Sequence, residues 1–478
     1  MKNQSMHFKA RATKSLADAT LQAKLVSIKD KFVDMRAQAV AELPEFEAMR
    51  EAGERIRDRV IGNLDVWLEE FETNAAARGA TVLWARDGGE ICRHVMDIAR
   101  RHGVVKVTKS KSMLSEEADL NLALERAGIR PVETDLGEYI LQINDNEPPS
   151  HIIAPVMHKT KSEVADLFER VHRRPRKTGI TDLAREAREM LRAHFLSAQM
   201  GISGGNFLIA ETGSAALVTN EGNGRMVTTL PKVHVVIAGI EKVIPTLEDL
   251  SLLLRLLTRS ASGQTISNYV SVLTGPRGRS DPDGPEYMYF ILVDNGRADM
   301  VGSAFQAMLR CIRCGACMNH CPVYQSVGGH AYGWVYPGPM GAILTPLFAG
   351  MGHAIELPHA ATLCNQCGAV CPVRIPLTQL LRKLRETQME QGLRPRRERV
   401  MLKLWSWLAR RPGCYAFGMA VVVRYMNWLA GGSDRIYVMG AAPAWTAGRD
   451  FPAPQGRTFR EIYARGGSPR AEPAARAM

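Results

Sequence analysis

The sequence predicts an α/β domain with a largely parallel sheet, followed by a helical region built around two groups of cysteines. Between residues 80 and 300, short apolar runs alternate with segments of helical periodicity, which is typical of strands joined by crossover helices. Between residues 311 and 372, seven of the nine cysteines fall into two clusters. Core packing does not produce such a concentration, so this region is expected to bind metal.

Length and composition indicate a globular protein of about two or three domains. The chain has 478 residues, of which 46% are hydrophobic and 23% are charged, as in ordinary globular proteins. Its net charge of +12 favours an acidic protein partner, an anionic ligand or a membrane surface. Two basic clusters, at residues 172–177 and 394–399, lie in no nucleic-acid-binding module. We interpret them as solvated surface and expect no nucleic-acid partner.

We expect residues 1–78 to form an N-terminal helical arm. From Glu45 to Arg78, apolar residues recur at helical spacing, which predicts one long amphipathic helix. Gly79 is a usual stop signal for such a helix. The apolar positions are Ile56, Val60, Leu64, Trp67, Leu68 and Phe71.

Residues 79–300 are expected to form the α/β domain. Strands are predicted at residues 82–84, 104–107, 151–154, 207–210, 215–218 and 233–237. Helices are predicted at residues 89–101, 115–127, 161–170 and 181–199. Ligands in such folds bind at the carboxyl ends of the strands.

Some loops of this domain could bind an anion. The loop from Lys109 to Met113 places lysines and hydroxyls before a predicted helix, with Ser115 as its N-cap. A basic turn with an ordinary helix cap explains the same residues. Glu211 begins a hydroxyl-rich segment at a strand end, and residues 223–226 are expected to form a hairpin turn. No G-x-G-x-x-G or Walker sequence is present, so nucleotide binding has no direct support.

Three carboxylates, Glu133, Asp135 and Glu138, lie close together in the sequence. They could position a proton donor or acceptor, although an acidic first turn of a helix explains them too. His151 could act in acid-base chemistry or be a core histidine.

The cysteine motifs have the spacing of iron-sulfur ligands. Three thiolates separated by two residues each can hold three irons of a cubane, and the fourth cysteine, followed by proline, ligates the other cluster. The two motifs are therefore expected to exchange ligands. The first cluster would take Cys311, Cys314, Cys317 and Cys371, and the second would take Cys321, Cys364 and Cys367.

The second cluster lacks one cysteine, because the position that matches the start of the first motif is Ala361. This site would hold either a [3Fe-4S] cluster or a [4Fe-4S] cluster with another ligand, for which His359, His320 and Cys414 are candidates. Two C-x2-C pairs also occur in zinc ribbons. A ribbon closes with four ligands, however, and would leave three of these cysteines unused.

We expect the iron-sulfur domain to span residues 301–392 and a helical extension with a disordered tail to span residues 393–478. The aromatic segment 330–339 can shield a cluster from water or can simply pack as a loop. A helix is predicted at residues 377–391, ending at Gly392. Residues 401–430 predict a buried or partner-facing helix pair rather than a membrane-surface one, and the tail from Gly466 is expected to be disordered.

The cysteines also indicate a compartment. Clustered thiolates that hold iron require a reducing environment. The start of the chain lacks the apolar region of a secretory signal, and no stretch reaches about 18 apolar residues. We therefore expect a cytoplasmic protein, able to associate with a membrane but without a transmembrane segment.

Five segments together resemble the lactate utilization protein B family, over residues 20–465. They are Lys-Ser-Lys-Ser-Met at 109–113, Glu-Thr-Asp-Leu-Gly-Glu-Tyr-Ile at 133–140, Pro-Ser-His-Ile at 149–152, Ala-Glu-Thr-Gly-Ser at 210–214 and Gly-His-Ala-Tyr-Gly-Trp-Val-Tyr-Pro-Gly-Pro at 329–339.

The resemblance implies a lactate-utilization (LUD) domain, similar in fold to ribose-5-phosphate isomerase and CoA transferases. A two-cluster ferredoxin-like domain and a C-terminal extension would follow it. It also implies two [4Fe-4S] clusters on the seven cysteines named above, so that the gap at Ala361 is a family feature. Its implied partners are the sister lactate utilization proteins A and C and an unidentified electron acceptor, in the oxidation of L-lactate to pyruvate.

On this basis we expect an electron-transfer subunit of a lactate-oxidising complex, with no catalytic residue assigned. One alternative is a self-contained oxidoreductase that binds a hydroxy acid in the LUD domain near Lys109, Lys111 and Glu211. Another is an assembly scaffold with structural metal. No flavin or nicotinamide motif is visible, so a hydride acceptor, if one is needed, would come from another subunit.

Overall fold

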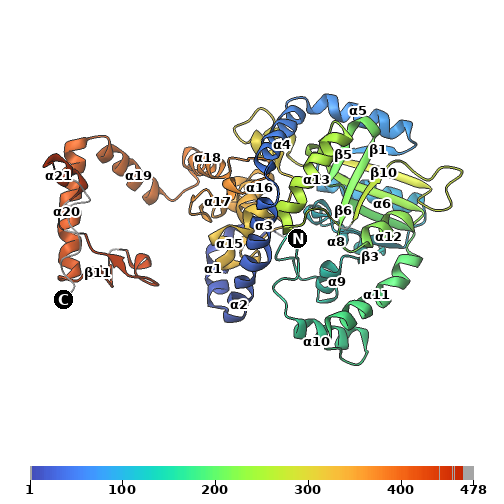
Figure 1. Ribbon diagram of the computed structural model, residues 1–478, viewed down its shortest axis with the longest axis horizontal. Coiled ribbons are helices and arrows are strands. Elements are labelled where there is room, and N and C mark those ends of the chain that lie inside the picture. The colour runs from blue at the N-terminus through green and yellow to red at the C-terminus, as the bar shows by residue number, and fades with distance from the viewer. Residues whose placement is uncertain (1–2, 268, 441, 455, 457, 467–478) are drawn as a thin grey trace. The chain divides into compact units, whose positions relative to one another are not determined.

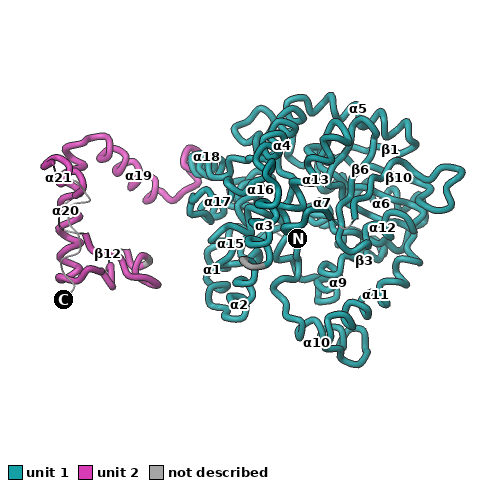
Figure 2. The backbone as a smooth tube through the Cα atoms, viewed as in Figure 1, with its two compact units in different colours: residues 1–388 teal, residues 389–478 magenta. Residues whose placement is uncertain are grey.

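The computed structural model describes the chain except for residues 1–2, 268, 441, 455, 457 and 467–478. It divides into two compact units, Met1–Gln388 and Met389–Met478, which Figure 2 colours separately. The domain boundaries expected at residues 79, 300 and 392 remain predictions. Beyond residue 466, the tail predicted to be disordered lies outside the described residues.

A six-stranded parallel sheet forms the α/β domain of unit 1, in the order β1-β10-β7-β4-β2-β3. In its register, Tyr289 of β10 pairs with Thr81 of β1 and with Val235 of β7. Every residue of β7 is buried, as expected for a parallel strand covered on both faces. The strands are β1 (Thr81–Ala85), β2 (Lys106–Lys109), β3 (Arg130–Glu133), β4 (Met200–Gly204), β7 (Val233–Gly239) and β10 (Tyr287–Val293).

Two apolar cores lie on opposite faces of this sheet, because successive strand residues point to opposite sides. Phe290 meets Phe71 of α5 on one face, with ring centroids 5.1 Å apart. On the other face, Ile291 belongs to the core that contains Val95 of α6 and Leu124 of α8. The helices of this region are α4 (Phe46–Ile61), α5 (Leu64–Ala77), α6 (Gly88–Arg101), α7 (Met113–Glu117), α8 (Leu120–Arg126), α9 (Leu136–Ile143), α10 (Lys161–His172), α11 (Ile180–Ser197), α12 (Asn223–Thr229) and α13 (Leu247–Ser262).

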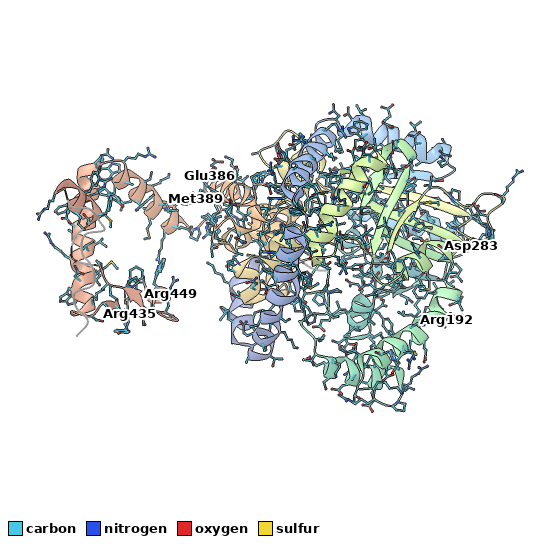
Figure 3. The ribbon with its side chains drawn as sticks, in the orientation of Figure 1. Arg192, Asp283, Glu386, Met389, Arg435 and Arg449 are labelled. Carbon is cyan, nitrogen blue, oxygen red and sulfur yellow. The ribbon has the colours of Figure 1, made fainter. Side chains whose placement is uncertain are left out.

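A second, four-stranded sheet has the order β8-β5-β6-β9. Gly213, before β6, has a φ of +63°, and a Cβ there would lie 2.2 Å from the backbone nitrogen of Ala75 in α5. Only glycine permits this approach. The loop from β9 to β10 carries Asp283 and projects from the domain (Figure 3). The strands are β5 (Phe207–Ile209), β6 (Ser214–Thr219), β8 (Val243–Ile244) and β9 (Tyr269–Leu273).

The N-terminal helices and the cysteine region form a third part of unit 1, beside the α/β domain (Figure 1). Both α1 and α2 contact α15, so segments from the two ends of unit 1 share one core. Tyr324, Tyr332 and Tyr336 lie in that core, each at most 1% exposed. The helices are α1 (Phe8–Ala17), α2 (Ala19–Ile28), α3 (Met35–Ala41), α14 (Ala316–Asn319), α15 (Pro322–Val327), α16 (Gly338–Ala349), α17 (Gln366–Ala369) and α18 (Leu377–Glu390).

Unit 2 contains the predicted C-terminal helix pair. Neither α19 nor α20 has a buried residue, and Trp405 and Trp428 are 61% and 74% exposed. The interpretation of this pair as buried is therefore wrong, and its partner-facing role remains a prediction. None of the described helices combines the length and apolarity needed to cross a membrane. The elements are α19 (Arg396–Ala409), α20 (Pro412–Ala430), β11 (Arg435–Ile436), β12 (Phe451–Pro452) and α21 (Phe459–Ala464).

Two predicted elements differ from the observed ones because glycines begin or end helices at these positions. The single helix expected over residues 45–78 is interrupted after Ile61, where Gly62 is the C-terminal cap of α4 and Asn63 leaves helical conformation. The hairpin turn expected at residues 223–226 is instead the first turn of α12, whose N-cap is Gly222 with a φ of 73°.

Two further predictions fail because of side-chain hydrogen bonds to the backbone. Residues 151–154 are not a strand, since Nδ1 of His151 accepts from the backbone N–H groups of Ile153 and Ala154 at 3.0 and 3.1 Å and curls the chain. Ser115 is not an N-cap. The cap of α7 is Ser112, whose hydroxyl accepts from the backbone N–H of Ser115.

Candidate iron-sulfur sites

The two cysteine motifs fold into the same short structure. In each, a central cysteine, Cys314 or Cys364, stands between two residues of positive φ, and a one-turn helix, α14 or α17, follows. The next cysteine lies within that helix and another lies just beyond it. The four flanking residues are Arg313, Gly315, Leu363 and Asn365. Superposed by this repeat, Ala361 occupies the place of Cys311.

The first group of sulfurs joins three cysteines of the first motif to one of the second. Burial, together with the nearby sulfurs of Cys371 and Cys311, raises the pKa of Cys314 to about 12. Burial, together with the sulfurs of Cys314, Cys311 and Cys371 and, as the smallest of these influences, that of Cys367, raises the pKa of Cys317 well above its usual value. Thiols with such pKa values do not ionise at neutral pH unless a cation compensates the thiolate charge.

The second group joins Cys321 to two cysteines of the second motif. Burial, with the sulfurs of Cys321 and Cys364 close by, raises the pKa of Cys367 to about 12. Cys364 differs from the others because it is exposed. A hydrogen bond from the Thr362 hydroxyl and one from the backbone N–H of Gln366 lower the pKa of Cys364.

The surroundings of the sulfurs fit iron-sulfur clusters. The backbone N–H of Ile375 donates to Sγ of Cys371 at 3.4 Å, the kind of bond that tunes cluster potentials. The hydroxyl of Tyr332 is buried without a hydrogen-bond partner among the described residues, and Cys321, Cys317 and Cys367 are its nearby acidic groups. A buried donor without an acceptor is costly, and cluster sulfur would provide the acceptor.

The two histidine candidates for the missing ligand have other partners. Nε2 of His359 lies 3.2 Å from Oε1 of Gln388 in α18. Nδ1 of His320 lies 2.9 Å from the carbonyl of Ala316 in its own turn. Cys414 belongs to unit 2, in α20. These contacts do not assign the ligand, and the type of the second cluster remains a prediction.

A buried network of charges adjoins the first group. Oε2 of Glu241 accepts from Nε of Arg297 at 2.8 Å, and its Oε1 lies 3.5 Å from Arg313, which follows Cys311 by two residues. Burial alone would raise the pKa of Glu241, but Arg297 and Arg313 lower it to about 2. Arg297 also pairs with Glu117 of α7 at 3.0 Å. The network therefore ties the first motif to the α/β domain.

Two more buried cations face Cys311. Burial lowers the pKa of Lys242 to about 8 and that of Arg57 to about 10, while the nearby Cys311 sulfur raises both. The guanidinium of Arg57 donates to the carbonyls of Glu241, Val243 and Leu309. Positive charges held here stabilise thiolates at the first site. Sequence reasoning missed both cations, because their partners lie far along the chain and leave no local signal.

The carboxyl ends of β2 and β3 carry a separate polar cluster. Nζ of Lys109 lies 2.6 Å from both Oε1 of Glu133 and Oδ1 of Asn121. Nζ of Lys111 lies 3.4 Å from Oε1 of Glu138. Burial raises the pKa of Glu138 to about 7. Asp135 also lies beside Glu138, so the structure brings both lysines and all three predicted carboxylates to the expected edge of the sheet.

Glu116 adjoins the same cluster, where burial, with the neighbouring carboxylate of Glu138, raises the pKa of Glu116 well above its usual value. Two predicted residues do not join the cluster. Glu211 lies elsewhere, because its Oε1 accepts from the backbone N–H of Leu247 at the start of α13. The expected grouping of Glu211 with the two lysines is therefore wrong. His151 is a core histidine, 1% exposed.

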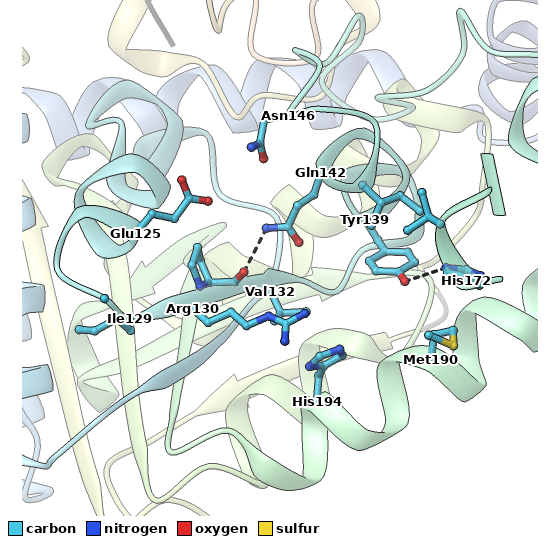
Figure 4. Close-up of a pocket in the computed structure, with 14 residues that line it drawn as sticks. Glu125, Ile129, Arg130, Val132, Tyr139, Gln142, Asn146, His172, Met190 and His194 are labelled. Carbon is cyan, nitrogen blue, oxygen red and sulfur yellow. Dashed lines mark hydrogen bonds between the residues drawn. The ribbon is translucent and has the colours of Figure 1, made fainter. Parts of the chain in front are cut away.

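A cavity of about 620 Å³ lies at the free edge of β3 (Figure 4). The side-chain amide of Gln142 covers part of this edge, donating to the carbonyl of Pro131 and accepting from the backbone N–H of Glu133. The hydroxyl of Tyr139 meets Nε2 of His172 at its rim. None of the cysteines lines the cavity, so it is distinct from the candidate metal sites.

Comparison with known proteins identifies three consecutive regions. The LUD domain family matches residues 68–293, the 4Fe-4S dicluster domain family matches residues 307–375, and the family "Lactate utilisation protein B, C-terminal" matches residues 381–468. This order confirms the predicted fold class.

Similar proteins resemble the chain over nearly its whole length. Proteins named lactate utilization protein B from Lysinibacillus sphaericus, Bacillus pumilus and Geobacillus kaustophilus are 43%, 42% and 42% identical to it. The alignments cover 96%, 97% and 98% of this chain and 97%, 98% and 99% of the relatives. A crystal structure of a DUF162 family protein from Deinococcus radiodurans is 13% identical, with a TM-score of 0.28, over 48% of this chain and 98% of that one. A TM-score this low does not establish a shared fold.

Proposed function

The chain belongs to the lactate utilization protein B family, and on this premise we propose that it carries electrons through two iron-sulfur clusters in the oxidation of L-lactate to pyruvate. The relatives' name supports a role in lactate utilization, and the match to a 4Fe-4S dicluster domain supports the cofactor. The observation that carries the proposal is that cysteines of both motifs meet in one core. There, burial and the sulfurs of Cys371 and Cys311 raise the pKa of Cys314, and burial and the sulfurs of Cys321 and Cys364 raise that of Cys367.

We assign the ligands by these groups. Sulfurs that lie close together shift one another's pKa values, and these shifts support a scheme in which the last cysteine of each motif binds the other cluster. Two-cluster ferredoxins exchange their last cysteines in the same way. The second site, with three sulfurs, takes either a [3Fe-4S] cluster or a [4Fe-4S] cluster with another ligand. The first cluster binds Cys311, Cys314, Cys317 and Cys371, and the second binds Cys321, Cys364 and Cys367.

Bound clusters supply one-electron redox chemistry. The chain's own residues hold and orient the sulfurs and exclude water. Arg50 donates to the carbonyl of Cys371 through Nε and Nη2, at 3.0 and 2.8 Å. Tyr336 lies beside Arg313 of the first motif, and Tyr332 lies beside sulfurs of both groups. Both tyrosines are buried, whereas Cys364 is exposed and gives the second group a side that faces solvent. A redox partner can therefore approach the second site more closely.

The partners of the proposed function are the sister proteins A and C and an unidentified electron acceptor. Trp405 and Trp428 support partner binding by unit 2, since exposed aromatic side chains are enriched in protein interfaces. Hydride chemistry on lactate would be done by a partner subunit.

A second candidate function is a hydroxy-acid oxidoreductase with its substrate in the LUD domain. The observation that favours it is the pairing of Lys111 with Glu138, a carboxyl group whose pKa lies near 7. An ammonium group can bind a carboxylate, and a carboxyl group with such a pKa can exchange protons near neutral pH.

The two candidates are separated by assaying the purified chain, with its clusters intact, for lactate-dependent reduction of an artificial acceptor. The electron-carrier proposal predicts no turnover by the chain alone and bleaching of its visible absorbance by lactate only when proteins A and C are added. Turnover by the chain alone that is lost in Lys111→Ala would instead establish the second candidate.

A further inference from the structure

Glu147, His158 and His330 converge where the loop between α9 and α10 meets the cysteine region. One ligand-type atom from each lies within 4.8 Å of those of the other two. Nε2 of His158 is 3.0 Å from Oε1 of Glu147, and the two imidazole rings are 4.5 Å apart between centroids. None of these residues belongs to the cysteine sites or to the polar cluster around Lys111.

Hydrogen bonds fix which nitrogen of each neutral ring carries the lone pair. Nε2 of His330 lies 2.8 Å from the carbonyl of Pro148. A carbonyl only accepts, so Nε2 carries the proton and the lone pair of the neutral ring is on Nδ1. The Ser150 hydroxyl donates to the carbonyl of Pro155 at 3.0 Å, so it accepts from Nδ1 of His158 at 2.7 Å. The lone pair of His158 is therefore on Nε2, facing Glu147.

The carboxylate is held in a similar way. Oε2 of Glu147 accepts a hydrogen bond from the side-chain amide of Asn144 at 2.7 Å and pairs with the ammonium group of Lys159 at 2.5 Å. Its Oε1 is left to face Nε2 of His158. Nε2 of His158 and Oε1 of Glu147 therefore face each other at 3.0 Å as two atoms that carry lone pairs, an arrangement that a cation would stabilise.

We propose that Glu147, His158 and His330 bind a zinc ion through Oε1, Nε2 and Nδ1. Two imidazole nitrogens and one carboxylate oxygen form a familiar zinc ligand set, with a fourth position for water. In each ligand, the polar atom that would not bind the metal makes a hydrogen bond that orients the side chain, as is usual for metal-bound histidine and carboxylate. Ligand atoms about 2 Å from a zinc ion lie about 3 to 4 Å from one another. Small side-chain rotations would therefore bring these three atoms to coordinating distance.

Such an ion would fasten the α/β domain to the cysteine region, because Glu147 and His158 come from one and His330 from the other. The N-terminal helices already meet at this point. Lys24 of α2 donates to the carbonyl of His158, and Arg11 of α1 donates to that of His330. The zinc site is independent of the proposed electron-transfer function, and it would persist if that function were wrong.

The test is metal analysis with zinc K-edge X-ray absorption on the full-length chain, purified anaerobically with its clusters intact. We expect one zinc per chain with nitrogen and oxygen neighbours at about 2.0 to 2.1 Å. A sulfur shell at about 2.3 Å would place the zinc in the cysteine sites and overturn the proposal. Absence of zinc, or mononuclear iron in the same nitrogen and oxygen shell, would overturn it too.

Variants locate the ion. His158→Gln and His330→Gln should each lose the zinc while keeping the cluster iron, whereas His353→Gln, at an exposed histidine, should keep both. If the ligand variants do not fold, Asn144→Ala and Ser150→Ala provide the second measurement. They leave the three ligands in place and remove hydrogen bonds to the second polar atoms of Glu147 and His158, so they should weaken zinc affinity by about 10- to 100-fold in chelator competition. Unchanged affinity in both would contradict the assignment.

Discussion

His151 donates a hydrogen bond from Nε2 to Oδ1 of Asn319, at 2.7 Å. The direction is fixed because Nδ1 of the same ring accepts from two backbone N–H groups. His151 belongs to the loop after α9, and Asn319 lies in α14 between two cysteine ligands of different sites. A core histidine thus positions the turn that separates the proposed clusters.

His151→Phe should destabilise unit 1. The substitution keeps an aromatic ring but leaves two backbone donors and the Asn319 amide oxygen unpaired, at about 1 to 3 kcal/mol for each buried group. We expect a loss of at least about 2 kcal/mol in urea unfolding under anaerobic conditions, with reduced iron content. His353→Phe, at an exposed histidine, is the control, and equal stability of the two variants would contradict the role of His151.

Glu241→Gln should be more damaging than its size suggests. The substitution leaves Arg297 and Arg313 without their shared buried carboxylate, and breaking a buried ion pair costs about 3 to 5 kcal/mol. Glu286→Gln is the matched control, because Glu286 also pairs with two cations but is 36% exposed. Its loss should stay below about 1 kcal/mol. Similar urea midpoints for the two variants would show that the network does not support the first motif.

The contribution of His234 to stability should decline as the pH falls below about 6.5. Burial lowers the pKa of His234 to about 3, so the folded protein binds no proton there while the unfolded chain does, and protonation favours unfolding. Its contribution should fall by about 1 kcal/mol between pH 6.5 and 5.5. Glu138 and Glu221, whose burial raises each pKa to about 7, act oppositely, losing stability as the pH rises from about 4.5 to 7.

The contribution of His234 is measured as the difference between the wild-type chain and His234→Gln in urea unfolding at both pH values. The variant should show the shallower pH dependence. Parallel curves would mean that His234 is not kept neutral in the fold.

Ala361→Cys should complete the second site. The repeat places Ala361 where the first motif has Cys311, so the new thiol would be an eighth ligand. We expect an iron content of about eight per chain and no paramagnetic signal in the oxidised protein. The control is Cys92→Ala, which removes a cysteine outside both motifs. An iron content and spectrum unchanged by Ala361→Cys would show that the site is already complete with another ligand.

Features set by short-range chemistry were predictable from the sequence. The cysteine spacing specified the repeated loops, and the apolar runs of β1, β5, β6 and β7 were recognised. β4 was missed because its two glycines and its serine weaken the strand pattern, and the short β3 contains Pro131. β10 is a continuous apolar run, a pattern typical of a buried strand in a parallel sheet.

Long-range contacts could not be predicted in the same way. Arg297 and Glu117 are separated by 180 positions, and Arg313 and Glu241 by 72. Nothing near any of these residues in the sequence indicates its partner. The grouping of Glu211 with the lysines failed for the same reason, because strand ends in two different sheets look alike in the sequence.

The central claim is tested most directly by electron paramagnetic resonance with iron and sulfide analysis, on anaerobically purified protein before and after dithionite. Two [4Fe-4S] clusters predict about eight irons and interacting signals only after reduction, whereas a [3Fe-4S] cluster at the second site predicts about seven irons and a signal in the oxidised protein. Either pattern fits an electron carrier with clusters on seven cysteines. Zinc in place of iron in the cysteine sites, or clusters that dithionite does not reduce, would contradict it.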